Sequence, residues 1–262
     1  MESIFTQDVL SVLSGSLVGF TLGLVGGGGS ILAVPLLVYV VRIGSPHLAI
    51  GTSAVAVAAS AFLNLLNHAR AGNVNWAVGS VFAASGIVGA AGGAALGKIV
   101  DGEALIGLFG LLMIGVGLSM LRKRSGGDAP VTLTRGNAAK LAGSGLAVGG
   151  LSGFFGIGGG FLVVPGLIAA TGMSLINSIG TSLLSITAFG STTATSYALS
   201  GLVDWRIAGF FILGGALGGL VGSWAGRYLA SRRQLLTWLF AGLVITTGLA
   251  VAVESGLGFF TA

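Results

Sequence analysis

Long apolar runs separated by short polar connections fill almost the whole chain. Ten such runs are expected to form helices, at residues 9–26, 30–43, 47–69, 74–97, 103–121, 138–156, 160–171, 174–199, 204–226 and 234–254. Most are close to the roughly 20 helical residues that cross about 30 Å of hydrocarbon. The second and seventh are too short for that, so we expect broken helices there. The pattern predicts an all-α polytopic membrane protein of about ten transmembrane segments.

Composition agrees with this class, because 54% of the residues are hydrophobic, only 7% are charged, and the mean hydropathy is +1.01. The opening stretch carries Glu2 and Asp8 and no basic residue, so we expect the first segment to be retained rather than cleaved as a signal. The basic residues lie in connections between segments, where they set topology. A net charge of +5 is therefore no sign of a nucleic-acid partner.

The chain contains an internal repeat. A shift of 130 residues lays GFTLGLVGGGGSILAVPLL over GLSGFFGIGGGFLVVPGL and its preceding glycine, and it pairs Pro35 with Pro165. A shift of 129 residues pairs the GTS at 51–53 with the GTS at 180–182, and GNVNW at 72–76 with GLVDW at 201–205. Glycines at 86, 89, 93 and 97 match glycines at 215, 218, 222 and 226. Spaced glycines of this last kind are typical of close helix packing.

The most polar stretch, 122–137, divides the chain into a first five-helix repeat at 1–121 and a second at 138–262. Because five is odd, the second repeat must enter the membrane from the opposite side, which gives inverted repeats. Ten crossings with a cytoplasmic linker place nine lysines and arginines inside and three outside. If the two short segments did not cross, the division would be seven and five. The positive-inside rule thus favours ten crossings with both termini outside.

These duplicated motifs, namely the G-x-G-G-G/S…P motif, the GTS and the G-x-V-[ND]-W, together resemble the sulfite exporter TauE/SafE family of prokaryotic membrane permeases. The resemblance covers nearly the whole chain. It implies transport of small sulfur-containing anions, such as sulfite, sulfonates or thiosulfate, across the inner membrane of a prokaryote. Both exporters and uptake systems occur in the family, so direction and substrate stay open.

Two glycine runs immediately precede the short segments. In a bilayer, irregular backbone persists only where it is buried in protein or lines a polar cavity. Free N–H groups and the positive end of a helix dipole would make each run an anion site, although close helix packing is the alternative. The candidate residues of these runs are Gly26, Gly27, Gly28, Gly29 and Ser30 in the first repeat, and Gly156, Gly158, Gly159 and Gly160 in the second.

The two GTS motifs supply hydroxyls near the start of the third helix of each repeat, from Thr52, Ser53, Thr181 and Ser182. These hydroxyls could replace water around an anion, or they could bond back to their own helix. Inversion predicts that each pair approaches the glycine run of the other repeat.

The later part of both third helices is also polar, which indicates a polar pathway through Asn64, His68, Thr193 and Tyr197. His68 could relay protons, or it could be an interfacial histidine without a chemical role. His47 is expected at the surface. Trp76 and Trp205 are expected to be interfacial anchors, each preceded by a helix cap at Asn75 or Asp204.

The absence of several functional groups from the sequence argues against several classes of function. Every acidic residue lies near a predicted helix end or connection, which argues against a cation transporter. The sequence offers no metal-ligand cluster, no Ser-His-acid set and no Lys-Ser/Thr after the glycine runs, so no enzyme, cofactor or ATP-driven motor is expected. We expect a secondary permease or facilitator for a small anion, and we retain a membrane scaffold and an anion channel as alternatives. The expected partners are that anion, the lipid bilayer and a second copy in a homodimer.

Overall fold

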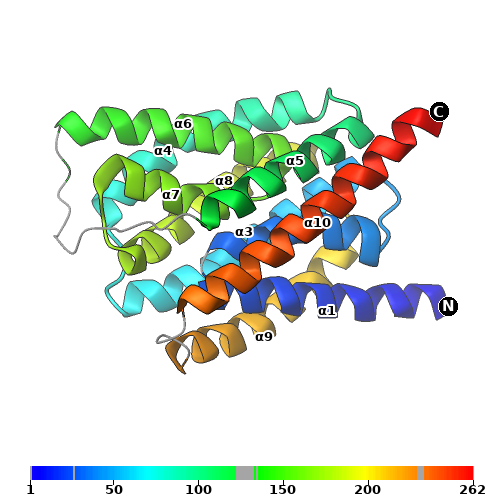
Figure 1. Cartoon of the computed structure of the whole chain (residues 1–262), viewed down its shortest axis with the longest axis horizontal. Helices are drawn as coiled ribbons and strands as arrows, with labels where there is room; N and C mark the ends of the chain where they lie inside the picture. Colours follow the sequence, from blue (N-terminus) through cyan, green and yellow to red (C-terminus); the bar gives the residue numbers. More distant parts are fainter. Residues whose placement is uncertain (1, 26, 122–132, 134, 229–232, 262) are drawn as a thin grey trace.

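The structure, a computed structural model, describes residues 2–25, 27–121, 133, 135–228 and 233–261. In this part of the chain all regular structure is helical (Figure 1). The elements of the first repeat are α1 (Glu2–Val25), the 3₁₀ helix η1 (Gly27–Leu32), α2 (Ala33–Pro35), the π-helix η2 (Leu36–Val40), α3 (Pro46–Arg70), α4 (Trp76–Gly97) and α5 (Gly102–Met120). Those of the second are α6 (Arg135–Phe155), α7 (Gly160–Thr171), α8 (Leu175–Leu199), α9 (Trp205–Tyr228) and α10 (Arg233–Thr261).

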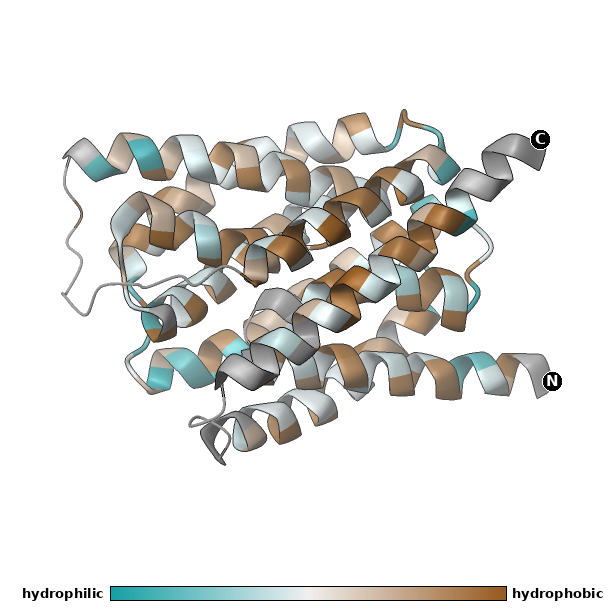
Figure 2. Cartoon of the chain, viewed as in Figure 1, coloured by the Kyte–Doolittle hydropathy of each residue, from teal (hydrophilic) through white to brown (hydrophobic). Residues whose placement is uncertain are grey.

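Five of the described helices, α1, α3, α4, α5 and α9, are long and apolar enough to cross a membrane. Hydrophobic colours dominate the helix bodies and hydrophilic colours gather toward the two ends of the bundle (Figure 2). The short apolar helices Gly29–Val40 and Gly160–Thr171 match the two segments that the sequence predicts to be short. The all-α polytopic prediction is therefore confirmed.

The first helix of one repeat packs along the fourth helix of the other. On α1 and α9, a Cβ on Gly19 would overlap the carbonyl oxygen of Gly215, and one on Gly23 would overlap that of Gly219. Because both contact positions advance by four residues, the two helices run parallel. The helices α4 and α6 repeat this arrangement, since Gly89 meets Leu146 and Gly93 meets Gly150. The packing role predicted for the spaced glycines is confirmed at these positions.

The corresponding helices α3 and α8 cross antiparallel at the centre. Gly51 near the start of α3 lies against Tyr197 near the end of α8, and Gly190 lies against Ala54 and Ala58. The fifth helices, α5 and α10, are also antiparallel, because Gly110 lies against Gly248 and Ala252 while Gly117 contacts Ile245. Equivalent helices of the two repeats therefore point in opposite directions, which is the inverted arrangement.

The short segments bring the chain back along the preceding helix. Gly29 lies against Thr21 near the end of α1, whereas the side chain of Gln7 near its start donates a 3.2 Å hydrogen bond to the carbonyl oxygen of Val41. The segment 27–41 thus runs antiparallel to α1 over most of its length. Both chain termini lie at the same end of the bundle (Figure 1). Most of the predicted linker, 122–137, lies outside the described residues, and the division at 1–121 and 138–262 remains a prediction.

Helix caps hold the starts of α4 and α9 at their predicted places. The side chain of Asn75 accepts a bond from the amide of Val78, and that of Asp204 accepts one from the amide of Ile207. Trp76 and Trp205 follow these caps and are exposed, as interfacial anchors would be.

Candidate functional site

The broken segments meet the crossing helices at the centre of the bundle. The 3₁₀ helix η1 contacts α7 and α8. A Cβ on Gly158 would fall 2.8 Å from the side chain of Val57 and 3.1 Å from that of Ile186. Val57 and Ile186 are each the twelfth residue of a 25-residue helix, α3 and α8 respectively. The second glycine run therefore reaches the middle of the molecule.

This run forms a tight turn that only glycine adopts without strain. Gly156, Gly158 and Gly159 have φ angles of +68°, +64° and +67°. The first hydrogen bonds that close α7 are donated by Leu162 and Val163, both to the carbonyl oxygen of Gly159. Among the described residues, the amides of Gly158 and Gly159 donate to no backbone carbonyl. Together with the open first turn of α7, they leave donors at a buried helix N-terminus.

The serine of the first GTS motif ties α3 to this turn. The hydroxyl of Ser53 lies 2.8 Å from the carbonyl oxygen of Ile50 and 3.1 Å from that of Gly156, and it can donate to either. Ser53 is completely buried. The contact joins the two repeats, and Ser53 thus approaches the glycine run of the other repeat.

Two further buried serines lie at the same level. Ser152 on α6 is fully buried, and its Oγ would lie 3.1 Å from a Cβ on Gly159. Ser185 on α8 is fully buried one residue before Ile186. Neither hydroxyl has a hydrogen-bond partner within the described part of the chain. Buried hydroxyls normally find partners, so the unpaired hydroxyl of Ser152 beside the open amides indicates a place for a polar ligand or water.

The first glycine run differs from the expected loop. Gly27, Gly28, Gly29 and Ser30 belong to η1, so the run is the first turn of the short segment rather than a loop before it. Gly26 lies outside the described residues. A Cβ on Gly29 would overlap the hydroxyl of Thr21, which means that this glycine permits close packing on α1. Ser30 is completely buried.

The GTS threonines are engaged elsewhere. The hydroxyl oxygen of Thr52 accepts a 3.0 Å bond from the amide of Asp204, and that of Thr181 accepts a 2.9 Å bond from the amide of Asn75. Each threonine thereby holds the start of the fourth helix of the other repeat. The hydroxyl of Ser182 donates to the carbonyl oxygen of Ile179 in its own helix. Their binding role remains a prediction.

The expected polar pathway consists of two separate patches. Asn64 donates to the carbonyl oxygen of Ser60 and packs against Gly219 on α9. His68 is half-buried further along α3, and its Nδ1 has no partner among the described residues. Near the opposite end of the bundle, Thr193 and Tyr197 are buried on α8, with unpaired hydroxyls in the described structure. The antiparallel crossing of α3 and α8 places the two patches apart.

His47, which the sequence places at the surface, is partly exposed at the start of α3 and also contacts the end of α4. Its Nε2 lies 3.2 Å from the carbonyl oxygen of Gly97 and 3.1 Å from that of Val100, at the end of α4. A proton on Nε2 can therefore satisfy carbonyls that no further helical turn reaches.

Sequence reasoning missed Ser152 and Ser185. The candidate residues were chosen because their motifs occur in both repeats. Neither serine meets this condition, because a shift of 130 pairs Ser152 with Leu22 and a shift of 129 pairs Ser185 with Ala56. The available signal was local, because Ser152 lies four residues before Gly156 and Ser185 lies one turn after Ser182. The lysines and arginines whose burial the structure describes are all at least partly exposed, namely Arg42, Arg70, Lys98, Lys140 and Arg206, so the donors seen at the centre are backbone amides and hydroxyls.

Inverted, interlocked helical repeats with broken segments meeting at the centre define a polytopic membrane protein of the type seen in secondary transporters. The model of the family described as Sulfite exporter TauE/SafE matches residues 11–251, and the chain belongs to that family.

Relatives of this chain align with most of its length. A probable membrane transporter protein of Xylella fastidiosa is 48% identical over 252 residues, which cover 94% of this chain and 95% of that protein. The probable membrane transporter protein YdhB of Bacillus subtilis is 28% identical over 221 residues, covering 82% of this chain and 89% of that protein. No solved structure matches the chain.

Proposed function

We propose that this protein is a secondary permease that exports a small anion, most simply sulfite or an organosulfonate, across the inner membrane of a prokaryote, with its linker in the cytoplasm. The family description and the names of the relatives support transport. The observation that supports an anionic substrate is the second glycine turn. Open amides and the unpaired hydroxyl of Ser152 meet there, at the midpoint of α3 and α8.

The donor set suits a ligand that must leave again. Backbone amides at a helix N-terminus, helped by the helix dipole, attract a negative charge. The hydroxyl of Ser152, which has no partner among the described residues, can donate to an oxyanion oxygen. A buried arginine would hold the anion more tightly, and conduction requires binding weak enough for release.

The test is flux in proteoliposomes that contain the purified protein alone. Vesicles loaded with sulfite should lose it faster than protein-free vesicles, and the rate should saturate with concentration. No flux of sulfite or methanesulfonate above the protein-free control would reject the permease and favour a scaffold. Flux that rises without saturation would instead identify a channel.

A further inference from the structure

Arg42 adopts a backbone conformation that arginine rarely takes. It has a φ of 59° and is the only residue other than glycine with positive φ among the described residues. It directly follows the short segment, where the amide of Ile43 donates a 3.0 Å bond to the carbonyl oxygen of Leu37. Helices commonly end in this way with one left-handed residue, and that residue is usually glycine.

The other repeat makes the corresponding turn with glycine. The shift of 130 residues that pairs Pro35 with Pro165 also pairs Arg42 with Gly172. Gly172 follows α7 with a φ of +71°, and its amide donates to the carbonyl oxygen of Ile168. The turn itself therefore needs no arginine, and an arginine that occupies it at the cost of strain points to a role for its side chain.

Arg42 lines a pocket at the end of the bundle that holds the termini. The pocket has a volume of about 660 Å³, and its polar lining also includes Thr6, Gln7 and Tyr39. The bond from Gln7 to the carbonyl oxygen of Val41 fixes one wall of the pocket directly beside Arg42. The pocket offers a cation and neutral donors, the set that recognises a small oxyanion.

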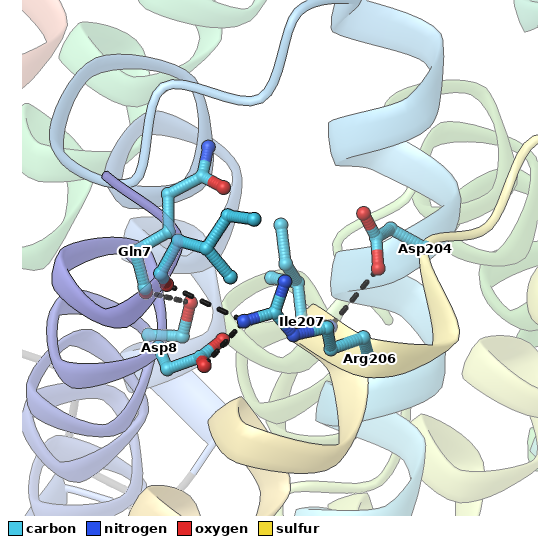
Figure 3. Close-up of polar contacts among 7 residues, drawn as sticks. Gln7, Asp8, Asp204, Arg206 and Ile207 are labelled. Carbon is cyan, nitrogen blue, oxygen red and sulfur yellow. Dashed lines mark hydrogen bonds and ion pairs between the residues drawn. The ribbon is translucent and has the colours of Figure 1, made fainter. Parts of the chain in front are cut away.

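The other basic residues at this end are already engaged. Arg206 forms an ion pair with Asp8, and Figure 3 shows the two side chains pointing toward each other beside Gln7. The ammonium of Lys98 donates to the hydroxyl of Ser200. Arg42 has no ion pair or hydrogen bond from its side chain in the part of the chain that the structure describes.

One carboxylate moderates this charge. Tyr39 forms a side-chain hydrogen bond with Ser255 and experiences the charge of Glu254 on α10. An anion in the pocket would thus meet the guanidinium of Arg42 beside a tyrosine that already lies in the field of one carboxylate. That balance favours brief capture over tight binding.

We propose that Arg42 binds the transported oxyanion at the mouth of the permease on the side of the termini, where an exported anion leaves. The inference rests on the proposed function and assigns it a second, peripheral binding site. The arginine is a binding residue at this outer mouth, and the central glycine turn remains the site midway through the membrane.

The absence of cysteine from the chain allows a charge test at this position. Arg42→Cys would be alkylated with 2-bromoethylamine, iodoacetamide or iodoacetate, which leaves a positive, a neutral or a negative side chain through thioethers that sulfite does not cleave. With sulfite offered to the terminus side at low ionic strength, the neutral and negative forms should raise KM about fivefold, and the positive form should restore it. Equal KM values in all three forms would overturn the mouth site.

Two variants separate capture from a capping role. Arg42→Gly relieves the strained turn, so its Tm should be unchanged or higher while its KM matches the neutral form. A lowered Tm with unchanged KM would show that Arg42 only caps the helix. Arg70→Gln, which removes one charge from the exposed end of α3, should leave KM unchanged.

The proposed transport function and the proposed Arg42 site can be tested separately. Absence of sulfite flux in vesicles with the wild-type protein would overturn the permease. Binding of sulfite at Arg42 would then be measured by calorimetric titration of the solubilised protein. Weaker binding by the neutral form than by the positive form would support the mouth site, and equal binding would overturn it.

Discussion

The hydroxyl of Ser53 lies 3.1 Å from the carbonyl oxygen of Gly156, a residue 103 positions further along the chain. This hydrogen bond connects the third helix of the first repeat to the glycine turn that opens α7 in the second. It therefore ties the central turn to α3, and we expect the orientation of the open amides to depend on it.

Ser53→Ala should lower sulfite flux and destabilise the fold by about 1 kcal/mol, because the turn loses one hydrogen-bond donor in a buried place. Ser80→Ala is the matched control, since that hydroxyl is exposed and bonds only to Trp76 in its own helix. Flux and thermal unfolding would be measured on both variants. Equal flux in the two would show that the turn keeps its geometry without Ser53.

Gly158→Ala should remove most of the flux. A Cβ there meets Val57 and Ile186, and the left-handed backbone costs a non-glycine residue about 1–2 kcal/mol. Gly92 lies in α4 with open space around it, so Gly92→Ala should be neutral or stabilising by up to about 1 kcal/mol. The measurement is flux per folded molecule in proteoliposomes. Normal flux in Gly158→Ala would mean that the turn is a packing device.

Gly19→Val should unfold the protein or lower its free energy of unfolding by about 3 kcal/mol or more, because the helix contact is overpacked. The added side chain would overlap the carbonyl oxygen of Gly215 and push α1 away from α9. Gly115→Val provides the control, because nothing lies near that glycine on α5. Yield of monodisperse protein and its Tm would decide, and similar values for the two variants would contradict the packing role.

Cysteines introduced at Ala71 and Glu103 should react with a membrane-impermeant maleimide from opposite sides. Both positions are exposed, at the two ends of the bundle, and the native chain has no competing thiol. The charge distribution predicts that residue 71 is labelled from the cytoplasm and residue 103 from outside. Labelling of both from the same side would rule out the ten-crossing arrangement.

Membrane voltage alone should drive flux. An inside-negative potential favours exit of an anion by about 2.3 kcal/mol per charge per 100 mV, so export needs no coupling ion. Potassium diffusion potentials of either sign, imposed across vesicles by valinomycin, should accelerate or slow sulfite exit accordingly. Rates that ignore voltage and follow a proton gradient would reject this and direct attention to His68.

Apolar runs, short segments and duplicated motifs allowed much of this architecture to be predicted. Residues 160–171 were expected as a short helix, and α7 has those bounds. The twin tryptophans and their caps were also expected, because capping depends on local spacing that sequence displays.

Contacts between distant elements could not be predicted in the same way. Thr52 and Thr181 looked like ligand residues, but each accepts a bond from an amide of the other repeat. Ser152 was not predicted as a site residue, because the candidates were residues duplicated in both repeats and the counterpart of Ser152 is Leu22. Whether four consecutive glycines form an open loop or a 3₁₀ turn depends on what packs against them, and Thr21 lies against Gly29 here.

The parallel contact of α1 with α9 has a consequence for how the protein is made. When α1 leaves the ribosome, the helix whose glycines receive it has not been synthesised, and it appears only after residue 205. Until then the glycine face of α1 has only lipid or an insertion factor to cover it. The delay is much shorter for α4, because its partner α6 begins at residue 135. Biogenesis should therefore complete the bundle late, when α9 enters and takes its place beside a helix inserted at the very beginning.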